Sequence, residues 1–188
     1  LQAAARWYRA AAEQGFGHGQ FNLGRCFENG WGVRQDKVEA SKWYQKAAEH
    51  GDVYGQNNLG RACENGWGVK KDLELAFYWY QQAAEAGLEH GQFNLARCYG
   101  NGWGTSKQLR EAVKWYTRAA EQGHADAQSN LGRCYENGWG LPTHLVDAAK
   151  WYRRAALQGH VYGQNNLGWC YENGLGVEKS LKQANEAV

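Results

Sequence analysis

The stretch GRCFENGWGV, from Gly24 to Val33, returns along this 188-residue chain at a constant spacing. Close copies begin at Gly60, Ala96 and Gly132, and a looser copy begins at Gly168. The offset is 36 residues each time, and no insertion disturbs it. A fixed period of this length is typical of a solenoid, in which each unit packs mainly on its neighbours. The sequence therefore predicts one array of equal units.

Two amphipathic helices accompany the motif in each unit. The first has one small or apolar face, formed in the first full unit by Gly19, Leu23, Cys26 and Phe27. The second has a wider apolar stripe, formed by Ala40, Trp43, Tyr44, Ala47 and Ala48. Small residues on a packing face allow helix axes to approach to about 8 Å. No strand-like alternation occurs, so the predicted fold class is all-α.

The glycine-tryptophan-glycine loop is predicted to connect these two helices. Gly30 stands where a left-handed residue commonly ends a helix, and only glycine adopts that conformation freely. Gly32 gives the turn a second permissive position. We interpret Trp31 and Val33 as apolar plugs under the turn. The alternative for the tryptophan is a row of exposed indoles that bind a ligand.

The start of the second helix also carries a sequence signal. Asp36 stands at the N-cap position, and Glu39 follows three residues later as in a capping box. Ser180 and Gln183 repeat this arrangement in the last unit. These signals place the helix boundaries directly after the glycine-rich loop.

The repeat register predicts a single domain over residues 1–188. Residues 1–15 form a partial repeat, and residues 160–188 form a truncated one. Whole repeats cover about 16–51, 52–87, 88–123 and 124–159. Ala187 and Val188 stand where the tryptophan-tyrosine pair of the second helix belongs, and such atypical ends lead us to expect end-to-end self-association. Because the sequence starts at Leu1 and lacks methionine, we also expect a piece of a longer protein or a designed sequence.

The segment Ala127–Gly159, AQSNLGRCYENGWGLPTHLVDAAKWYRRAALQG, resembles the Sel1-like repeat family. The family pattern is A-x-x-x-L-G-x-x-Y-x-x-G-x-G-V, followed by A-x-x-W-Y-x-x-A-A and a closing glycine. The resemblance covers essentially the whole chain. It implies a right-handed α/α solenoid of antiparallel helix pairs with a 36-residue repeat, related to tetratricopeptide repeats. It further implies that the first helices line the concave side and that the protein is an adaptor between other proteins.

Composition excludes several function classes. The net charge of +2 does not indicate nucleic-acid binding, and no run of 18 apolar residues indicates membrane insertion. Sequence motifs of hydrolases, P-loop proteins and zinc proteases are missing. The six histidines do not share one row of the repeat. We therefore expect no catalytic residues, no metal site and no cofactor.

The cysteines are predicted to be free. Cys26, Cys98, Cys134 and Cys170 occupy equivalent positions, which in a solenoid lie about 8–10 Å apart. A disulfide requires Cα atoms within about 7 Å of each other. Buried thiols of this kind favour a reducing compartment such as the cytoplasm.

One face of the first helix lies opposite its apolar face and carries four rows of residues. An arginine row ends in a tryptophan: Arg25, Arg61, Arg97, Arg133 and Trp169. An asparagine row is constant: Asn22, Asn58, Asn94, Asn130 and Asn166. Two rows vary: Phe21, Asn57, Phe93, Ser129 and Asn165, and His18, Tyr54, His90, Asp126 and Tyr162. Because duplication explains constancy within one chain, the varied rows are the more informative.

These rows predict a peptide-binding groove. Arginine binds carboxylates and peptide carbonyls through a planar fork, asparagine can pair with extended backbone, and aromatic side chains act as anchors. The partner would be a protein or peptide segment, acidic or aromatic-rich. The predicted site residues are Arg25, Arg61, Arg97, Arg133, Trp169, Asn22, Asn58, Asn94, Asn130, Asn166, Phe21, Asn57, Phe93, His18, Tyr54, His90 and Tyr162.

Structural explanations of the same rows stay open. Each arginine can pair with a nearby acid, as Arg25 with Glu28 or Arg133 with Glu136, which contributes only about 0–1 kcal/mol. Trp169 can be a binding anchor or can cover the last repeat. For the whole chain, a non-enzymatic scaffold is the main hypothesis. The alternatives are an accessory module of a larger enzyme or signalling protein, and a designed array without a natural ligand.

Overall fold

The computed structural model describes residues 1–186, and within them it contains eleven helices and no strand. The all-α fold class is therefore confirmed. The prediction about Ala187 and Val188 lies outside the described residues. The helices are α1 (Gln2–Glu13), α2 (Gly17–Asn29), α3 (Lys37–Glu49), α4 (Val53–Asn65), α5 (Leu73–Glu85), α6 (Glu89–Asn101), α7 (Leu109–Glu121), α8 (Ala125–Asn137), α9 (Leu145–Leu157), α10 (Val161–Asn173) and α11 (Leu181–Glu186).

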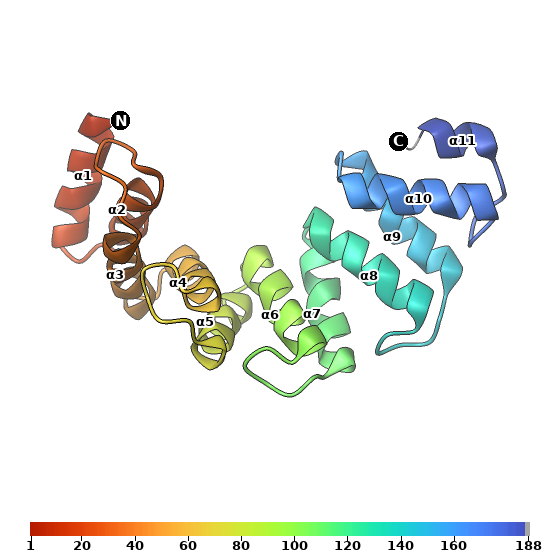
Figure 1. The fold of residues 1–188 in the computed structure, drawn as a ribbon, viewed down its shortest axis with the longest axis horizontal. Coiled ribbons are helices and arrows are strands. Elements are labelled where there is room, and N and C mark those ends of the chain that lie inside the picture. The colour runs from red at the N-terminus through yellow and green to blue at the C-terminus, as the bar shows by residue number, and fades with distance from the viewer. Residues whose placement is uncertain (187–188) are drawn as a thin grey trace. The chain divides into compact units, whose positions relative to one another are not determined.

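The helices pack into two compact units. The first unit comprises residues 1–91 with 103–105, and the second comprises residues 92–102 with the described residues from 106 to 186. Within each unit, consecutive helices form antiparallel pairs (Figure 1). Besides these neighbours, α2 contacts α4 in the first unit and α8 contacts α10 in the second. The first helices of adjacent repeats therefore lie side by side in each unit. A single array over residues 1–188 remains a prediction.

Close helix packing depends on small residues at two positions of the first helix. A Cβ atom on Gly19 would lie 2.8 Å from the Cβ atom of Ala11 in the preceding helix. A Cβ atom on Gly60 would lie 2.8 Å from the ring of Tyr80 in the following helix. Both distances are shorter than van der Waals contact allows, so these glycines set how near the neighbouring helices come.

The two loop glycines have different tasks. Gly66 ends α4 in the left-handed region, at φ +72°, as the sequence predicts. Gly68 is also left-handed, at φ +71°, and a Cβ atom there would lie 2.0 Å from the carbonyl oxygen of Lys37. That carbonyl belongs to the first turn of α3 in the preceding repeat. The second glycine is therefore a packing point between repeats as well as a turn residue.

The predicted helix caps are present. The side chain of Asp36 accepts hydrogen bonds from the backbone N–H groups of Val38 and Glu39, at 2.9 and 3.0 Å. Ser180 accepts one from the N–H of Gln183 at 3.3 Å. These bonds satisfy donors that the first turn of a helix leaves free.

All five cysteines are buried and free, which confirms that they do not pair. Burial raises the pKa of the Cys63, Cys134 and Cys170 thiols to about 11. These three groups are therefore protonated at neutral pH. A protonated, buried thiol is a poor nucleophile and metal ligand, so they act as core residues.

A buried glutamine near the start of the first helix reaches the end of the second helix in its repeat. The Oε1 atom of Gln92 accepts a hydrogen bond from Gln122 at 2.7 Å, and Gln128 accepts one from Gln158 at 2.8 Å. Ala86 takes the donor position in the repeat of residues 52–87. Among the described residues, Oε1 of Gln56 there is buried and has no hydrogen-bond partner.

We expect Ala86→Gln to raise the free energy of unfolding by about 1 kcal/mol, because it supplies the missing donor to Gln56. Urea denaturation followed by circular dichroism measures the change. The matched control is Gln122→Ala, which recreates the defect in the next repeat and should lower stability by a similar amount. A neutral or destabilising effect of Ala86→Gln would refute this account of the glutamine contacts.

Candidate functional site

The first unit has an open hollow of about 620 Å³ on the face formed by α2 and α4. We call it the first-unit hollow. Nine residues predicted from the sequence line it: His18, Phe21, Asn22, Arg25, Tyr54, Asn57, Asn58, Arg61 and His90. Three further lining residues were not predicted: Glu28, Asn29 and Trp31. The repeat register thus brings the predicted side chains of this unit to one surface.

Aromatic rings form part of this hollow. The ring of Phe21 stacks on that of Tyr54 with centroids 5.4 Å apart and planes inclined by 26°. The ring centroid of His18 lies 5.5 Å from that of Phe21 and 6.0 Å from that of Tyr54. Because Tyr54 belongs to the next repeat, these contacts join α2 to α4. Such contacts contribute roughly 0.5–1.5 kcal/mol each beyond the area they bury.

The arginines do not pair with the acids that the sequence suggested. The carboxylates of Glu28 and Glu136 instead accept hydrogen bonds from the hydroxyls of Tyr44 and Tyr152, at 2.5 and 2.6 Å. Across the described residues, neither Arg25 nor Arg133 has a carboxylate within 4.0 Å. For Arg25 and Arg133 the hypothesis of a local arginine–glutamate pair is therefore wrong, because the glutamate accepts a hydrogen bond from a tyrosine instead.

The arginines lie instead against the loop tryptophans. The guanidinium carbon of Arg25 lies 5.1 Å from the ring centre of Trp31, and that of Arg133 lies 5.2 Å from Trp139. Trp31 and Trp139 are 39% and 40% exposed. Interpreting Trp31 as a plug under the turn is thus only partly right, because arginine lies over its ring but 39% of the residue meets solvent. Val33, the other predicted plug, packs against the core.

Several residues predicted on the exposed face are buried. They are Phe21, Asn57, Asn94 and Ser129. For Phe21, Asn57 and Ser129 the reason is that α2 contacts α4, and α8 contacts α10, in addition to the second helix of each repeat. Most of the surface of these side chains is used in packing, although Phe21 and Asn57 still line the first-unit hollow.

Part of the variation between repeats has a structural cause. His18 Nδ1 lies 3.2 Å from a carboxylate oxygen of Asp52 in the next repeat. In the second unit the order is reversed, because Asp126 replaces the histidine and His160 replaces the aspartate, with 3.0 Å between them. This varied row therefore encodes contacts between repeats as well as surface chemistry.

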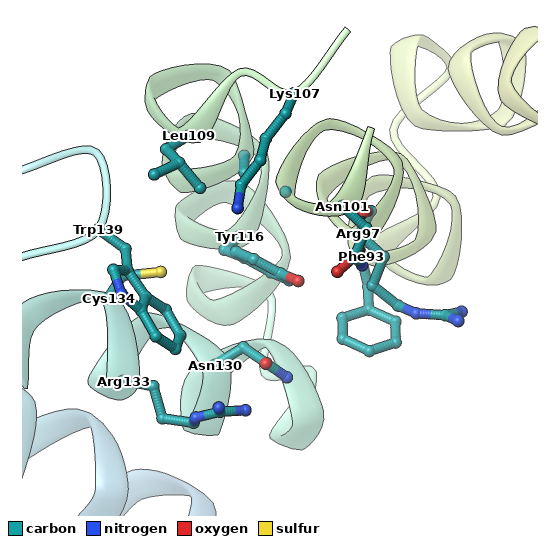
Figure 2. Close-up of a pocket in the computed structure, with 12 residues that line it drawn as sticks. Phe93, Arg97, Asn101, Lys107, Leu109, Tyr116, Asn130, Arg133, Cys134 and Trp139 are labelled. Atoms are coloured by element: carbon teal, nitrogen blue, oxygen red, sulfur yellow. Dashed lines mark hydrogen bonds between the residues drawn. The ribbon is translucent and has the colours of Figure 1, made fainter. Parts of the chain in front are cut away.

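The second unit contains a cavity of about 420 Å³ between α6, α7 and α8, which we call the second-unit cavity. Four of the predicted residues line it: Phe93, Arg97, Asn130 and Arg133. Figure 2 shows the ring of Tyr116 in the middle of this cavity, with Trp139 on one side and Phe93 on the other. Tyr116, Lys107 and Trp139 were not predicted as site residues.

Besides the buried Asn94 of α6, three further predicted residues of the second unit lie on α10. Tyr162 and Trp169 are 72% and 53% exposed, and Asn166 is half-buried. None of the three lines the second-unit cavity. The exposure of Trp169 means that most of its indole is not used to cover the last repeat.

The family model for the Sel1 repeat matches six segments of the chain: residues 1–16, 17–52, 53–88, 90–124, 125–160 and 161–186. The chain belongs to the Sel1 repeat family. The sequence-based resemblance is thereby confirmed. No curated protein matches the chain in a sequence search.

Solved structures agree with this assignment. A protective antigen of uropathogenic Escherichia coli strains with an SLR fold is 37% identical, with a TM-score of 0.91 over 97% of this chain and 39% of the antigen. A Sel1 repeat protein of Oxalobacter formigenes is 36% identical, with a TM-score of 0.91 over 99% of this chain and 74% of that protein. An immunity protein of Pseudomonas aeruginosa, at 21% identity and a TM-score of 0.65 over 97% of this chain and 70% of that one, shares the fold alone.

Three Sel1 repeats share a tyrosine–glutamate hydrogen bond that the repeat of residues 88–123 lacks. The hydroxyls of Tyr44, Tyr80 and Tyr152 donate to glutamate carboxylates at 2.5 to 2.6 Å. In the repeat of residues 88–123, Gly100 replaces the glutamate. The hydroxyl of Tyr116 has no hydrogen-bond partner among the described residues. Alignment of the repeats at 36 residues shows the Gly100 exception, although its consequence depends on the packing.

Three further features of these Sel1 repeats concern metal ligands, helix length and tyrosine hydroxyls. In the described part of the chain, no three His, Cys, Asp or Glu side chains come together as a metal site. No helix there combines the length and apolar character needed to cross a bilayer. Burial raises the pKa of Tyr116, and burial together with the bond to Glu136 raises that of Tyr152. Both hydroxyls are therefore hydrogen-bond donors at neutral pH.

We expect Tyr152→Phe to lower the free energy of unfolding by about 1–2 kcal/mol, because it leaves the Glu136 carboxylate without its donor. The matched change Tyr116→Phe should alter stability by less than about 0.5 kcal/mol, since its hydroxyl has no partner to lose. Urea denaturation of the two variants measures the difference. Equal losses would show that the tyrosine–glutamate bond does not stabilise the repeat.

Proposed function

We propose that this chain is a protein–protein interaction scaffold that binds a peptide segment on the surface formed by the first helices of its repeats. Sel1 repeat proteins are generally protein–protein interaction modules. The observation that carries the proposal for this chain is the first-unit hollow, where nine residues chosen from the sequence line one open surface.

The chemistry of the first-unit hollow suits an extended peptide. Arg25 makes no hydrogen bond with any described residue, so its donors are available to carbonyl or carboxylate oxygens. The amide of Asn22 donates to the carbonyl of His18 at 3.0 Å, which leaves its oxygen available to accept from a peptide N–H. The exposed ring of Tyr54 offers an apolar contact. Together these groups can hold a backbone and select acidic or aromatic side chains.

A role as an accessory module of a larger protein is compatible with this proposal. The chain spans 39% of the length of the E. coli antigen structure that it resembles. In a longer protein that contains this chain, peptide binding by the repeats would recruit or position a partner for the other parts of that protein.

The test uses a peptide selected from a random displayed library against the whole chain, with its affinity measured by fluorescence anisotropy. The double variant Arg25→Ala and Arg61→Ala should weaken binding at least about tenfold, because each arginine offers charge-assisted hydrogen bonds. Circular dichroism reports whether the fold is kept.

A double variant with the same change in charge, Arg34→Ala and Arg110→Ala, serves as the control. Both side chains are exposed and neither lines the first-unit hollow. Its affinity should equal that of the unchanged chain. Equal affinity for the Arg25 and Arg61 variant, with the fold intact, would reject the hollow as the binding surface.

A further inference from the structure

The second-unit cavity differs from the equivalent place in the first unit by the loss of one acidic side chain. In the first unit, Glu28 lines the first-unit hollow and also a separate space of only about 10 Å³. That small space is otherwise lined by residues that include Tyr44, Asn58 and Trp67. Glu28 therefore borders both spaces, as does Asn58.

The equivalents of those residues line one continuous cavity in the second unit. Tyr116, Asn130 and Trp139 correspond to the three residues of the small space, and Phe93 and Arg97 correspond to residues of the open hollow. Gly100 occupies the position that Glu28 has in the first unit. The volume is about 420 Å³, which lies within the range of small-ligand pockets, roughly 300–1,000 Å³.

Tyr116 lines this cavity, and its hydroxyl is not used by another described protein group. Tyr116 is only 8% exposed, and its hydroxyl makes no hydrogen bond with the described residues. In three other repeats the corresponding hydroxyl donates to a carboxylate. An acceptor that enters the cavity can therefore take a hydrogen bond from a donor that no described protein group uses.

The position of the Tyr116 ring is itself a consequence of the sequence. In three other repeats the ring lies against a glycine; a Cβ atom on Gly132, for example, would lie 2.6 Å from the ring of Tyr152. In the repeat of Tyr116 the equivalent residue is Ala96, whose side chain is a methyl group where the other repeats have only a hydrogen atom. The ring therefore cannot occupy the same place as in its neighbours.

The lining of the cavity is cationic. It includes Arg97, Lys107 and Arg133, and it includes no aspartate or glutamate. The side chain of Lys107 extends toward the Tyr116 ring in Figure 2. Phe93 and Trp139 offer apolar walls for a methylene stem. An anion on a short aliphatic chain matches this combination of hydroxyl donor, cations and aromatic walls.

We propose that the second-unit cavity binds the carboxylate of a glutamate side chain from a partner peptide, in the place that the repeat's own glutamate fills elsewhere in the chain. The Tyr116 hydroxyl donates to this carboxylate, and Lys107 and Arg133 neutralise it. This proposal deepens the proposed peptide-binding function and rests on it, since it names one side chain of the bound segment and where it enters.

The probe is N-acetyl-L-glutamic acid amide, titrated into the isotope-labelled whole chain and followed by two-dimensional amide NMR. We expect saturable shifts at the Gly100 amide and at the Trp139 indole N–H. The neutral glutamine analogue of the probe has the same shape without the charge, and its affinity should be at least about tenfold lower.

Three variants locate the interaction. Tyr116→Phe should weaken the glutamic acid probe about tenfold, the value of one hydrogen bond to a charged group. Gly100→Glu should abolish the shifts, because it returns the missing carboxylate. The helix accepts this change sterically, since the nearest atom to the new Cβ would be the Cβ of Ala112 at 3.7 Å. Tyr78→Phe, an exposed tyrosine of the first unit, should leave the affinity unchanged.

Thermal unfolding of each variant shows whether it is folded before its affinity is compared. Equal affinity for the glutamine analogue, an unchanged affinity in Tyr116→Phe, or shifts that persist in Gly100→Glu would each overturn the proposal. The peptide selected against the chain separates this proposal from the broader one. If that peptide binds Gly100→Glu normally but not the Arg25 and Arg61 variant, the cavity proposal fails while the peptide-binding function stands.

Discussion

The structure depends on one close contact, in which a tyrosine of the second helix lies against a glycine of the first. In three repeats the ring fits because that glycine has no side chain, and the hydroxyl then reaches a glutamate one turn further along the first helix. The contact sets the spacing of the two helices. It also engages the glutamate carboxylate in a hydrogen bond with the tyrosine. The arginine that shares the same helix consequently lies against the loop tryptophan with its donors turned to the surface. Packing between the two helices of a repeat thus determines which hydrogen-bonding groups its surface offers.

The repeat of residues 88–123 shows what happens when this contact changes. Ala96 replaces the glycine and Gly100 replaces the glutamate. The tyrosine therefore loses both the space against the first helix that its ring fills elsewhere and the carboxylate that accepts its hydrogen bond. The space that opens is continuous with the surface and is lined by cations. In a chain whose repeats otherwise agree closely, this departure is the feature with the clearest consequence for binding. The glycine-tryptophan-glycine loops, by contrast, combine both roles, because the second glycine packs repeat on repeat while the tryptophan stays partly exposed.

Much of the fold could be predicted from the sequence, because its signals are local and repeated. The helix boundaries follow from Asp36 and Gly30, and the free state of the cysteines follows from the period alone. The burial of Phe21 and Asn57 could not be predicted from one helix, since it arises from contact with the next repeat. Nor could the tyrosine–glutamate bond be predicted, because its two residues lie on different helices. Nine residues of the first-unit hollow were nevertheless found from the sequence, since equal spacing forces them onto one face.

The free energy of unfolding of Gly132→Ala, measured by urea denaturation, tests the role of the glycine–tyrosine contact most directly. Alanine favours an α-helix over glycine by about 1 kcal/mol, so helix propensity alone predicts a gain in stability. Our account predicts a net loss of about 1–2 kcal/mol, because the new methyl group displaces the Tyr152 ring and separates its hydroxyl from Glu136. A gain in stability with the tyrosine–glutamate bond intact would contradict it.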